Sequence, residues 1–158
     1  MCHHLEIMQV MMVLLMQNVL IMQERLLDIC PSVSVNVHPC FFLPENADTF
    51  DFSQYSYVVD AVDTVSAKME LVRRANAAGV PIISSMGTGN KLDPTKFVVT
   101  DLAKTDTCPL ARVLRQRLRK KGIQHLQVVY STEPAMTPLE IIEDGGRRQL
   151  PGSVSFVP

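Results

Sequence analysis

Two aspartates lie where a carboxylate could handle a metal ion. Asp60 falls near the end of the apolar run Tyr57–Val62, which is typical of a strand buried on both faces, and Asp63 follows that run directly. Carboxylates at the end of a strand can hold Mg²⁺ on the phosphates of a nucleotide, because hard cations take oxygen ligands. Asp63 can equally cap a helix that follows, since aspartate is a favoured N-cap residue. The spacing alone favours the cap slightly.

A glycine-rich loop, Met86-Gly87-Thr88-Gly89-Asn90-Lys91, follows the next predicted strand. Glycine has no Cβ, so its backbone can approach a ligand closely. The spacing matches neither of two phosphate-binding patterns, G-x-G-x-x-G and G-x-x-x-x-G-K-[ST]. As a pattern, the loop is therefore better interpreted as an ordinary turn, with ligand binding as the alternative.

A cluster of cations lies between Lys104 and Lys121, with a net charge of +6 in a chain whose net charge is −1. Within it, Arg112, Arg115 and Arg119 are spaced i, i+3, i+7 and share one face of a predicted helix. Such a stripe can lie along the phosphates of a nucleic acid. A solvated face that balances the helix dipole explains the pattern equally well. No aromatic residues interleave, so base stacking on this helix is not expected.

The cysteines and histidines form no catalytic or metal-binding signature. Cys2, Cys30, Cys40 and Cys108 include no C-x-x-C pair, and this spacing fits neither a zinc site nor a small disulfide scaffold. Cys108 precedes a predicted helix, where a thiolate is stabilised, but no histidine lies near it in the sequence, which favours a structural cysteine. An intracellular, reduced protein is the default interpretation.

Strand and helix patterns alternate along the chain and would position these residues. This alternation predicts a mostly parallel α/β sheet with helices on both faces. Ligands of such sheets bind at the carboxyl ends of the strands, where the aspartates and the glycine-rich loop lie. The predicted strands are Val33–Val37, Tyr57–Val62, Pro81–Ser85, Phe97–Val99 and Leu126–Tyr130, and the main predicted helices are Ser66–Ala78 and Pro109–Lys121.

The chain has 158 residues, of which 47% are apolar and 20% charged, enough to build one domain with a sizeable core. Its N-terminal segment, residues 1–18, is apolar and rich in methionine. The unbroken apolar run Val10–Met16 is far shorter than the roughly twenty residues of a spanning helix, and a basic start and cleavage site are missing. A buried or partner-covered helix is expected there, with a membrane-associating segment as the alternative.

The stretch Tyr57–Lys68 resembles the ThiF/MoeB superfamily, the adenylating enzymes related to ubiquitin activators. Three further stretches, Ile83–Thr95, Pro109–Arg115 and Pro151–Pro158, are similar to its tRNA threonylcarbamoyladenosine dehydratase branch, also called the TcdA or CsdL type. The resemblance covers residues 19–158. It implies a Rossmann-like nucleotide-binding fold and an enzyme that uses ATP to adenylate the threonylcarbamoyl carboxylate on tRNA, which then closes to a ring with loss of water.

The resemblance also implies roles for single residues. Asp63 would handle Mg²⁺ and the phosphates, and the loop Gly87–Lys91 would lie near the reacting end of the substrate. The residues expected to flank ATP are Asp60, Asp63, Thr64 and Val65, and those expected to face tRNA are Arg112, Arg115, Arg119 and Lys120. Further implied partners are a second copy of the chain and, in some members, a sulfur-relay protein. The implied compartment is intracellular, cytoplasmic or organellar.

The sequence also departs from the family pattern. Members begin with a strand, a glycine-rich nucleotide loop and further ATP-binding residues, all of which would precede Leu20, and residues 1–18 match none of them. The chain is therefore expected to represent the later part of an adenylating domain, lacking its first β-α-β unit. The alternative is a non-catalytic remnant or interaction module that keeps the sheet and the basic face.

Overall fold

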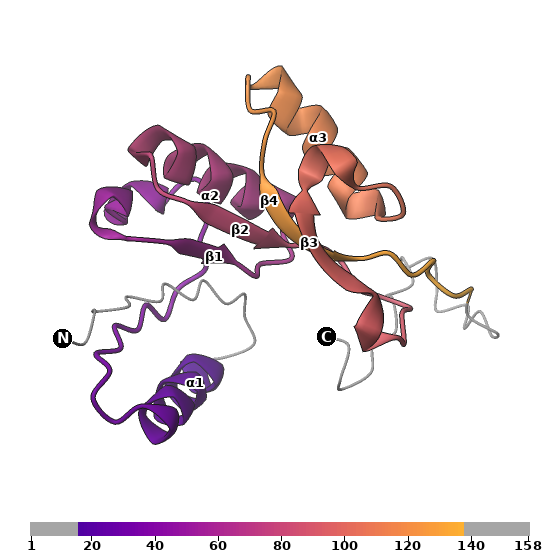
Figure 1. Cartoon of the computed structure of the whole chain (residues 1–158). Coiled ribbons are helices and arrows are strands. Elements are labelled where there is room, and N and C mark those ends of the chain that lie inside the picture. Colours follow the sequence, from indigo (N-terminus) through magenta and orange to yellow (C-terminus); the bar gives the residue numbers. More distant parts are fainter. Residues whose placement is uncertain (1–15, 138–158) are drawn as a thin grey trace, which may run out of the picture.

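The computed structural model describes residues 16–137, and of residues 16–19 the backbone only. It contains a four-stranded sheet in the order β1-β2-β4-β3, with β3 antiparallel to β4 and the other pairs parallel (Figure 1). The strands are β1 (Val58–Asp60), β2 (Ile82–Ser85), β3 (Phe97–Asp101) and β4 (Gln127–Ser131), and the helices are α1 (Met16–Ile29), α2 (Val65–Ala78) and α3 (Pro109–Lys120). The prediction of a mostly parallel α/β fold is confirmed.

Local sequence signals set the ends of the two helices that pack on the sheet. Gly79 ends α2 with a φ of 68°, a left-handed conformation that glycine adopts without steric cost. Pro109 occupies the first position of α3, where its missing N–H removes no helical hydrogen bond. Gly122 follows that helix with a φ of 78°. These signals place both helices within one residue of their predicted bounds.

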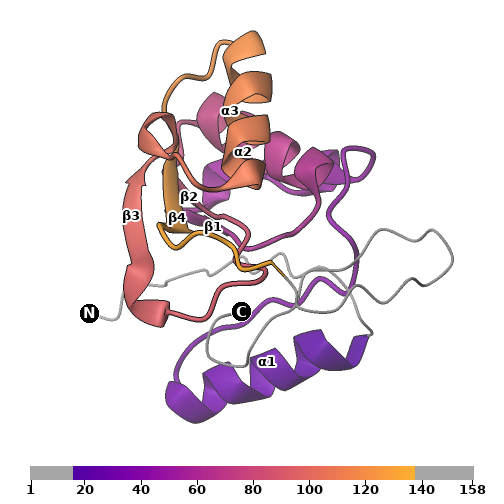
Figure 2. The same cartoon turned by 90° about the vertical axis from the view of Figure 1, so that its right-hand side faces the viewer.

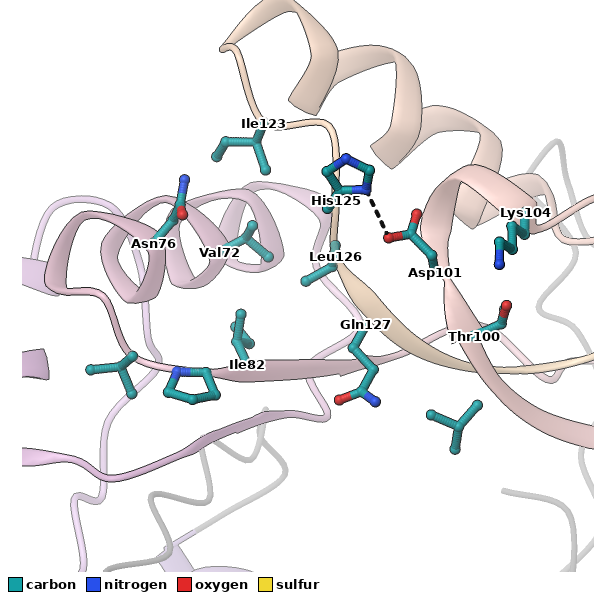
Figure 3. A pocket seen from close by; sticks show the side chains of 13 residues that line it. Val72, Asn76, Ile82, Thr100, Asp101, Lys104, Ile123, His125, Leu126 and Gln127 are labelled. Atoms are coloured by element: carbon teal, nitrogen blue, oxygen red, sulfur yellow. Dashed lines mark hydrogen bonds and ion pairs between the residues drawn. The ribbon is translucent and has the colours of Figure 1, made fainter.

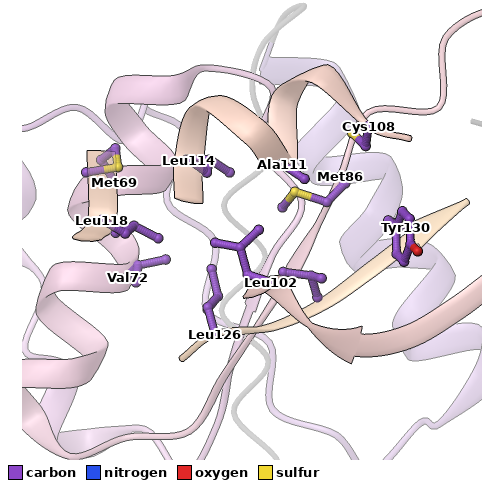
Figure 4. Close-up of a cluster of buried hydrophobic side chains, with 11 residues drawn as sticks. Met69, Val72, Met86, Leu102, Cys108, Ala111, Leu114, Leu118, Leu126 and Tyr130 are labelled. Carbon is purple, nitrogen blue, oxygen red and sulfur yellow. The ribbon is translucent and has the colours of Figure 1, made fainter. Parts of the chain in front are cut away.

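The core lies between the sheet and these two helices. Aromatic side chains before β1 pack against β1 and α2 in a cluster formed by Phe42, Ala47, Phe50, Phe52, Val58, Val62, Ala67, Leu71 and Ala75. A second cluster joins α2, α3, β4 and the turn after β3 (Figure 4); it contains Met69, Val72, Met86, Leu102, Cys108, Ala111, Leu114, Leu118, Leu126, Val128 and Tyr130. Cys108 is thus a core residue, as the structural interpretation predicted.

One face of the sheet carries α2 and α3, and α1 lies on the other side of the sheet in both views (Figure 2). The side chain of Val59, in the middle of β1, is 46% exposed. The prediction that this strand is buried on both faces is therefore wrong for Val59, because the helices that pack closely, α2 and α3, cover only the face toward which Val58 and Asp60 point.

Helix α1 exposes apolar side chains, including Leu20, Ile21 and Ile29. The predicted N-terminal segment lies outside the described residues except for 16–18, which begin this helix. The resemblance at Pro151–Pro158 lies outside them as well. Among the described residues, no helix has the length and apolar character needed to cross a membrane.

The strand predicted at Val33–Val37 is wrong. Its valines are half-buried, and Ser34 and Asn36 between them are exposed, so the alternation of side chains is as expected. The backbone nevertheless pairs with no strand among residues 16–137; the carbonyl of Val35 accepts a hydrogen bond from the Gln23 side chain at 3.2 Å instead. Alternation reports which side chains are covered, and a helix can cover them as well as a sheet.

Glu70 of α2 stabilises the fold through ion pairs with Arg73 and Arg74, and its contribution can be measured. Hydrogen bonds from Arg73 and Arg74, opposed by burial, lower its pKa from 4.5 to about 2, and Arg74 also pairs with Asp48 at 2.7 Å. Because the folded pKa is depressed, this stability is present above about pH 4.5 and is lost as the pH falls toward about 2. We expect Glu70→Gln to lower the free energy of unfolding by about 1–2 kcal/mol near neutral pH, since the arginines are partly solvated.

Urea denaturation at about pH 7 and about pH 3 measures this effect. The difference in the free energy of unfolding between the wild type and Glu70→Gln should be smaller at the lower pH. Glu24→Gln, at an exposed position of α1, is the matched control and should change stability little at either pH. A gap of equal size at both pH values would contradict the ion-pair account.

Candidate functional site

The carboxyl ends of β1 and β2 form one edge of the sheet. The two strands are parallel, and Asp60 stands opposite Ser84 in the ladder. The chain leaves β1 through residues 61–64 and leaves β2 through residues 86–91, so both loops begin at the same edge. The structure therefore brings together the two segments that the sequence singled out. We refer to them as the Asp63 turn (61–64) and the Gly87 loop (86–91).

Asp63 is exposed, and its side chain forms no hydrogen bond or ion pair with the part of the chain that the structure describes. The N-cap of α2 is Thr64, so the interpretation of Asp63 as the helix cap is wrong. A solvent-facing carboxylate at a strand end suits Mg²⁺, which is commonly held by one or two carboxylates together with substrate phosphates. Thr64 and Val65 are half-buried at the N-terminus of α2, where the helix dipole favours negative charge.

Asp60 has a different environment, because its side chain is fully buried. Its Oδ1 accepts hydrogen bonds from the backbone N–H of Val62 at 3.1 Å and from Lys68 Nζ at 3.2 Å. Its Oδ2 accepts from the same ammonium at 3.2 Å and from the hydroxyl of Ser84. The carboxylate is thus engaged by protein groups, so Asp60 organises the Asp63 turn and offers no free oxygen to a nucleotide.

The Gly87 loop is held by hydrogen bonds to the last residue of β4 and to the chain that follows β4. Lys91 is 2% exposed, and its ammonium donates to the carbonyl of Ser131 at 2.7 Å. The backbone N–H of Met136 donates to the carbonyl of Asn90 at 2.8 Å, and Asn90 has a φ of 59°. Thr88 is also buried. Lys91 therefore anchors the loop, and its buried ammonium does not extend into solvent.

Sequence reasoning missed two residues that hold these loops. Glu133, after β4, accepts hydrogen bonds from the backbone N–H groups of Leu92 and Asp93, directly after the Gly87 loop, at 3.0–3.1 Å. Lys68 of α2 is 1% exposed and reaches the ends of both strands. The available signal for Lys68 was a lysine on the apolar side of a helix, one turn before Leu71 and Val72.

Only some of the cations in the predicted basic stripe are exposed to solvent. Arg112, Arg119 and Lys120 are exposed and form no ion pair with another described residue. Arg115 is half-buried, and its Nη1 donates to the carbonyl of Thr105 at 2.5 Å and to that of Leu102 at 3.2 Å. Arg115 thus ties α3 to the turn after β3, and the exposed cations of this face are the other three.

A cavity of about 570 Å³ lies at the opposite edge of the sheet, where β2 and β4 begin (Figure 3). His125 Nδ1 and Asp101 Oδ2, both in its lining, lie within hydrogen-bonding distance at 3.2 Å. The lining residues are Val72, Asn76, Val80, Pro81, Ile82, Val99, Thr100, Asp101, Lys104, Ile123, His125, Leu126 and Gln127, and none of the predicted site residues is among them. The cavity is therefore separate from the edge that carries Asp63.

Comparison with models of known protein families identifies the family of this chain. The sequence model of the ThiF family matches residues 14–137. The chain belongs to the ThiF family. The resemblance noted from Tyr57–Lys68 is thereby confirmed, and the Asp63 turn and the Gly87 loop both lie inside the matched range.

Two bacterial relatives of this chain are named tRNA threonylcarbamoyladenosine dehydratase. The protein of Bacillus subtilis is 40% identical over 125 residues, which are 78% of this chain and 48% of that protein. The protein of Escherichia coli is 37% identical over 126 residues, 75% of this chain and 47% of that protein. The chain thus spans about half the length of these curated relatives.

Solved structures of the E. coli enzyme, TcdA, have the same fold. Its complex with ATP aligns with a TM-score of 0.70 at 36% identity, over 77% of this chain and 53% of that chain. Its complex with AMP aligns with a TM-score of 0.73 at 34% identity, over 90% of this chain and 60% of that chain. The similarity of this ThiF-family chain to the dehydratase branch therefore holds in both sequence and structure.

Proposed function

We propose that this chain serves in the ATP-dependent dehydration of threonylcarbamoyladenosine in tRNA. The observation that carries the proposal is the exposed carboxylate of Asp63, which has no side-chain partner among residues 16–137 and lies at the edge shared by the Asp63 turn and the Gly87 loop. It occurs in a fold whose relatives are named dehydratases and include one solved with ATP.

The proposed reaction has two steps, adenylation of the carboxylate and closure of the ring. First, a carboxylate oxygen of the threonylcarbamoyl group attacks the α-phosphorus of ATP, and pyrophosphate leaves. Then the carbamoyl group attacks the activated carbonyl carbon and releases its N–H proton to water, the ring closes, and AMP leaves with the former carboxylate oxygen. A carboxylate alone is a poor electrophile, and adenylation gives it a good leaving group. The substrate loses one water in total, whose oxygen ends on AMP.

The residues of this chain have separate roles in the proposal. Asp63 would hold Mg²⁺, which when bound neutralises charge on the phosphates, and the donor type and exposure of Asp63 fit that ion. The N-terminus of α2, at Thr64 and Val65, would favour the negative charge of the nucleotide. The anchored Gly87 loop would border the reacting end of the substrate.

The partner that we propose is tRNA, and its contact surface is the basic face formed by Arg112, Arg119 and Lys120. These three exposed cations, which lie between Arg112 and Lys120 on one helix, suit a row of backbone phosphates. The resemblance to the dehydratase branch suggests two further partners, a second copy of the chain and a sulfur-relay protein. It suggests an intracellular location, cytoplasmic or organellar, where tRNA is present.

A mass-spectrometric assay tests this function. The protein is incubated with ATP, Mg²⁺ and tRNA that carries threonylcarbamoyladenosine. The tRNA is then digested, and the masses of its nucleosides are measured. We expect the modified nucleoside to lose the mass of one water as AMP and pyrophosphate form in equal amounts. If the nucleoside keeps its mass while the tRNA still binds, the dehydratase proposal is wrong and an interaction module is the better account.

A further inference from the structure

A buried network connects the two loops of the candidate site. Its centre is the ammonium of Lys68, in the first turns of α2, whose side chain is 1% exposed. Asp60 at the end of β1 and Ser84 in β2 are both fully buried beside it. Within the described residues, every buried side-chain nitrogen or oxygen has a hydrogen-bond partner, so this polar centre is complete.

The Lys68 ammonium contacts the starting point of each loop. It donates to Asp60 at 3.2 Å, and Asp60 in turn accepts the backbone N–H of Val62 inside the Asp63 turn at 3.1 Å. It also donates to the carbonyl of Ser85, directly before the Gly87 loop, at 2.6 Å. An ammonium has three N–H donors and no acceptor, so one Lys68 side chain can serve both strand ends at once.

The network has more connections than charge balance requires. A buried lysine could compensate a buried aspartate without touching any loop, and such a pair adds little to stability compared with apolar residues of similar size. Here the shortest contact of Lys68 is with a neutral carbonyl of the neighbouring strand, and its carboxylate partner holds a backbone N–H of the turn. Both features fix the position of one strand end relative to the other.

We propose that Lys68 is a positioning residue that holds the Asp63 turn and the Gly87 loop in the mutual arrangement that binds Mg²⁺·ATP. The inference rests on the proposed function for the identity of the ligand. It does not depend on that function for the link between the two loops. Lys68 itself, being buried, does not touch the ligand.

Three variants separate positioning from charge compensation. Lys68→Met alone leaves the Asp60 carboxylate buried and unpaired, which should lower the melting temperature by about 10–20 °C. Asp60→Asn combined with Lys68→Met removes both charges and keeps an oxygen for the N–H of Val62, so most of this loss should be recovered. Lys96→Met is the matched control at an exposed lysine and should change nothing.

Hydrogen exchange at backbone amides is the deciding readout. In the double variant, we expect amides of the Gly87 loop to exchange about tenfold faster than in the wild type, because a hydrogen bond from a charged donor to Ser85 has been lost. We also expect a KM for Mg²⁺·ATP about tenfold higher. Recovery of both stability and slow exchange would show that Lys68 only compensates charge, and a double variant that fails to fold would also contradict the proposal.

Failure of the proposed function gives a different result. If the wild-type protein does not bind Mg²⁺·ATP, the proposed ligand is wrong. The exchange comparison between the wild type and the double variant needs no nucleotide. It therefore still decides whether Lys68 holds the two loops together.

Discussion

Replacing Asp63 with alanine should lower the rate of ATP-dependent ring closure by at least about 100-fold, because the phosphate charge then lacks its metal-holding carboxylate as AMP departs. The fold should tolerate the change. Asp63 is exposed and has no side-chain partner within the described residues, so the melting temperature should stay within about 2 °C of the wild type. Formation of AMP, measured alongside a thermal melt, checks both expectations.

The control for this variant is Asp28→Ala, which removes an exposed carboxylate from α1, an element outside the Asp63 turn and the Gly87 loop. It should leave both the rate and the melting temperature unchanged. Full activity of Asp63→Ala would show that Asp63 does no more than precede the N-cap of α2. A large loss of stability in Asp63→Ala would show that the residue supports the fold instead of the ligand.

Reversing the three charges of the basic face of α3 should weaken tRNA binding. In the variant with Arg112→Glu, Arg119→Glu and Lys120→Glu, each lost phosphate contact removes about 0.7–0.9 from the slope of log affinity against log salt. Three lost contacts should therefore flatten the slope by about 2–3, with a loss of affinity of at least about tenfold at low salt. Arg115 stays unchanged because it anchors the turn after β3.

Filter binding at several salt concentrations measures this effect. A control with Arg25→Glu and Lys96→Glu changes exposed cations on other elements and should leave the slope nearly as it is. Binding of Mg²⁺·ATP should be the same in all three proteins, since none of the changed residues belongs to the Asp63 turn or the Gly87 loop. Overlapping curves for the wild type and the α3 variant would end the nucleic-acid interpretation of this helix.

Local patterns predicted most of the fold. Apolar runs located β1, β2 and β4, and glycine stops located the ends of α2 and α3. Val33–Val37 shows the limit of this reasoning, because alternating burial does not reveal whether a backbone has a partner strand. Whether a segment pairs with another strand depends on how the whole sheet is assembled, and five residues alone do not contain that information.

The candidate site was predicted less completely. Asp60 and Asp63 are both strand-end carboxylates, and nothing within that stretch tells them apart. The difference comes from Lys68, whose position on the buried side of α2 directs its ammonium to Asp60 and leaves Asp63 in solvent. Arg115 is a second example. Its spacing predicted a place on the basic face, but its guanidinium donates a hydrogen bond to the carbonyl of Thr105, which the local spacing does not reveal.

The central claim is that Mg²⁺·ATP binds at the carboxyl edge of β1 and β2. Paramagnetic broadening of amide NMR signals by Mn²⁺·ATP tests it most directly, since manganese takes the same oxygen ligands as magnesium. We predict broadening at residues 61–65 and in the Gly87 loop, lost in Asp63→Ala. Broadening around Ile82, His125 and Gln127, at the cavity on the opposite edge, with the Asp63 turn unaffected, would contradict the account.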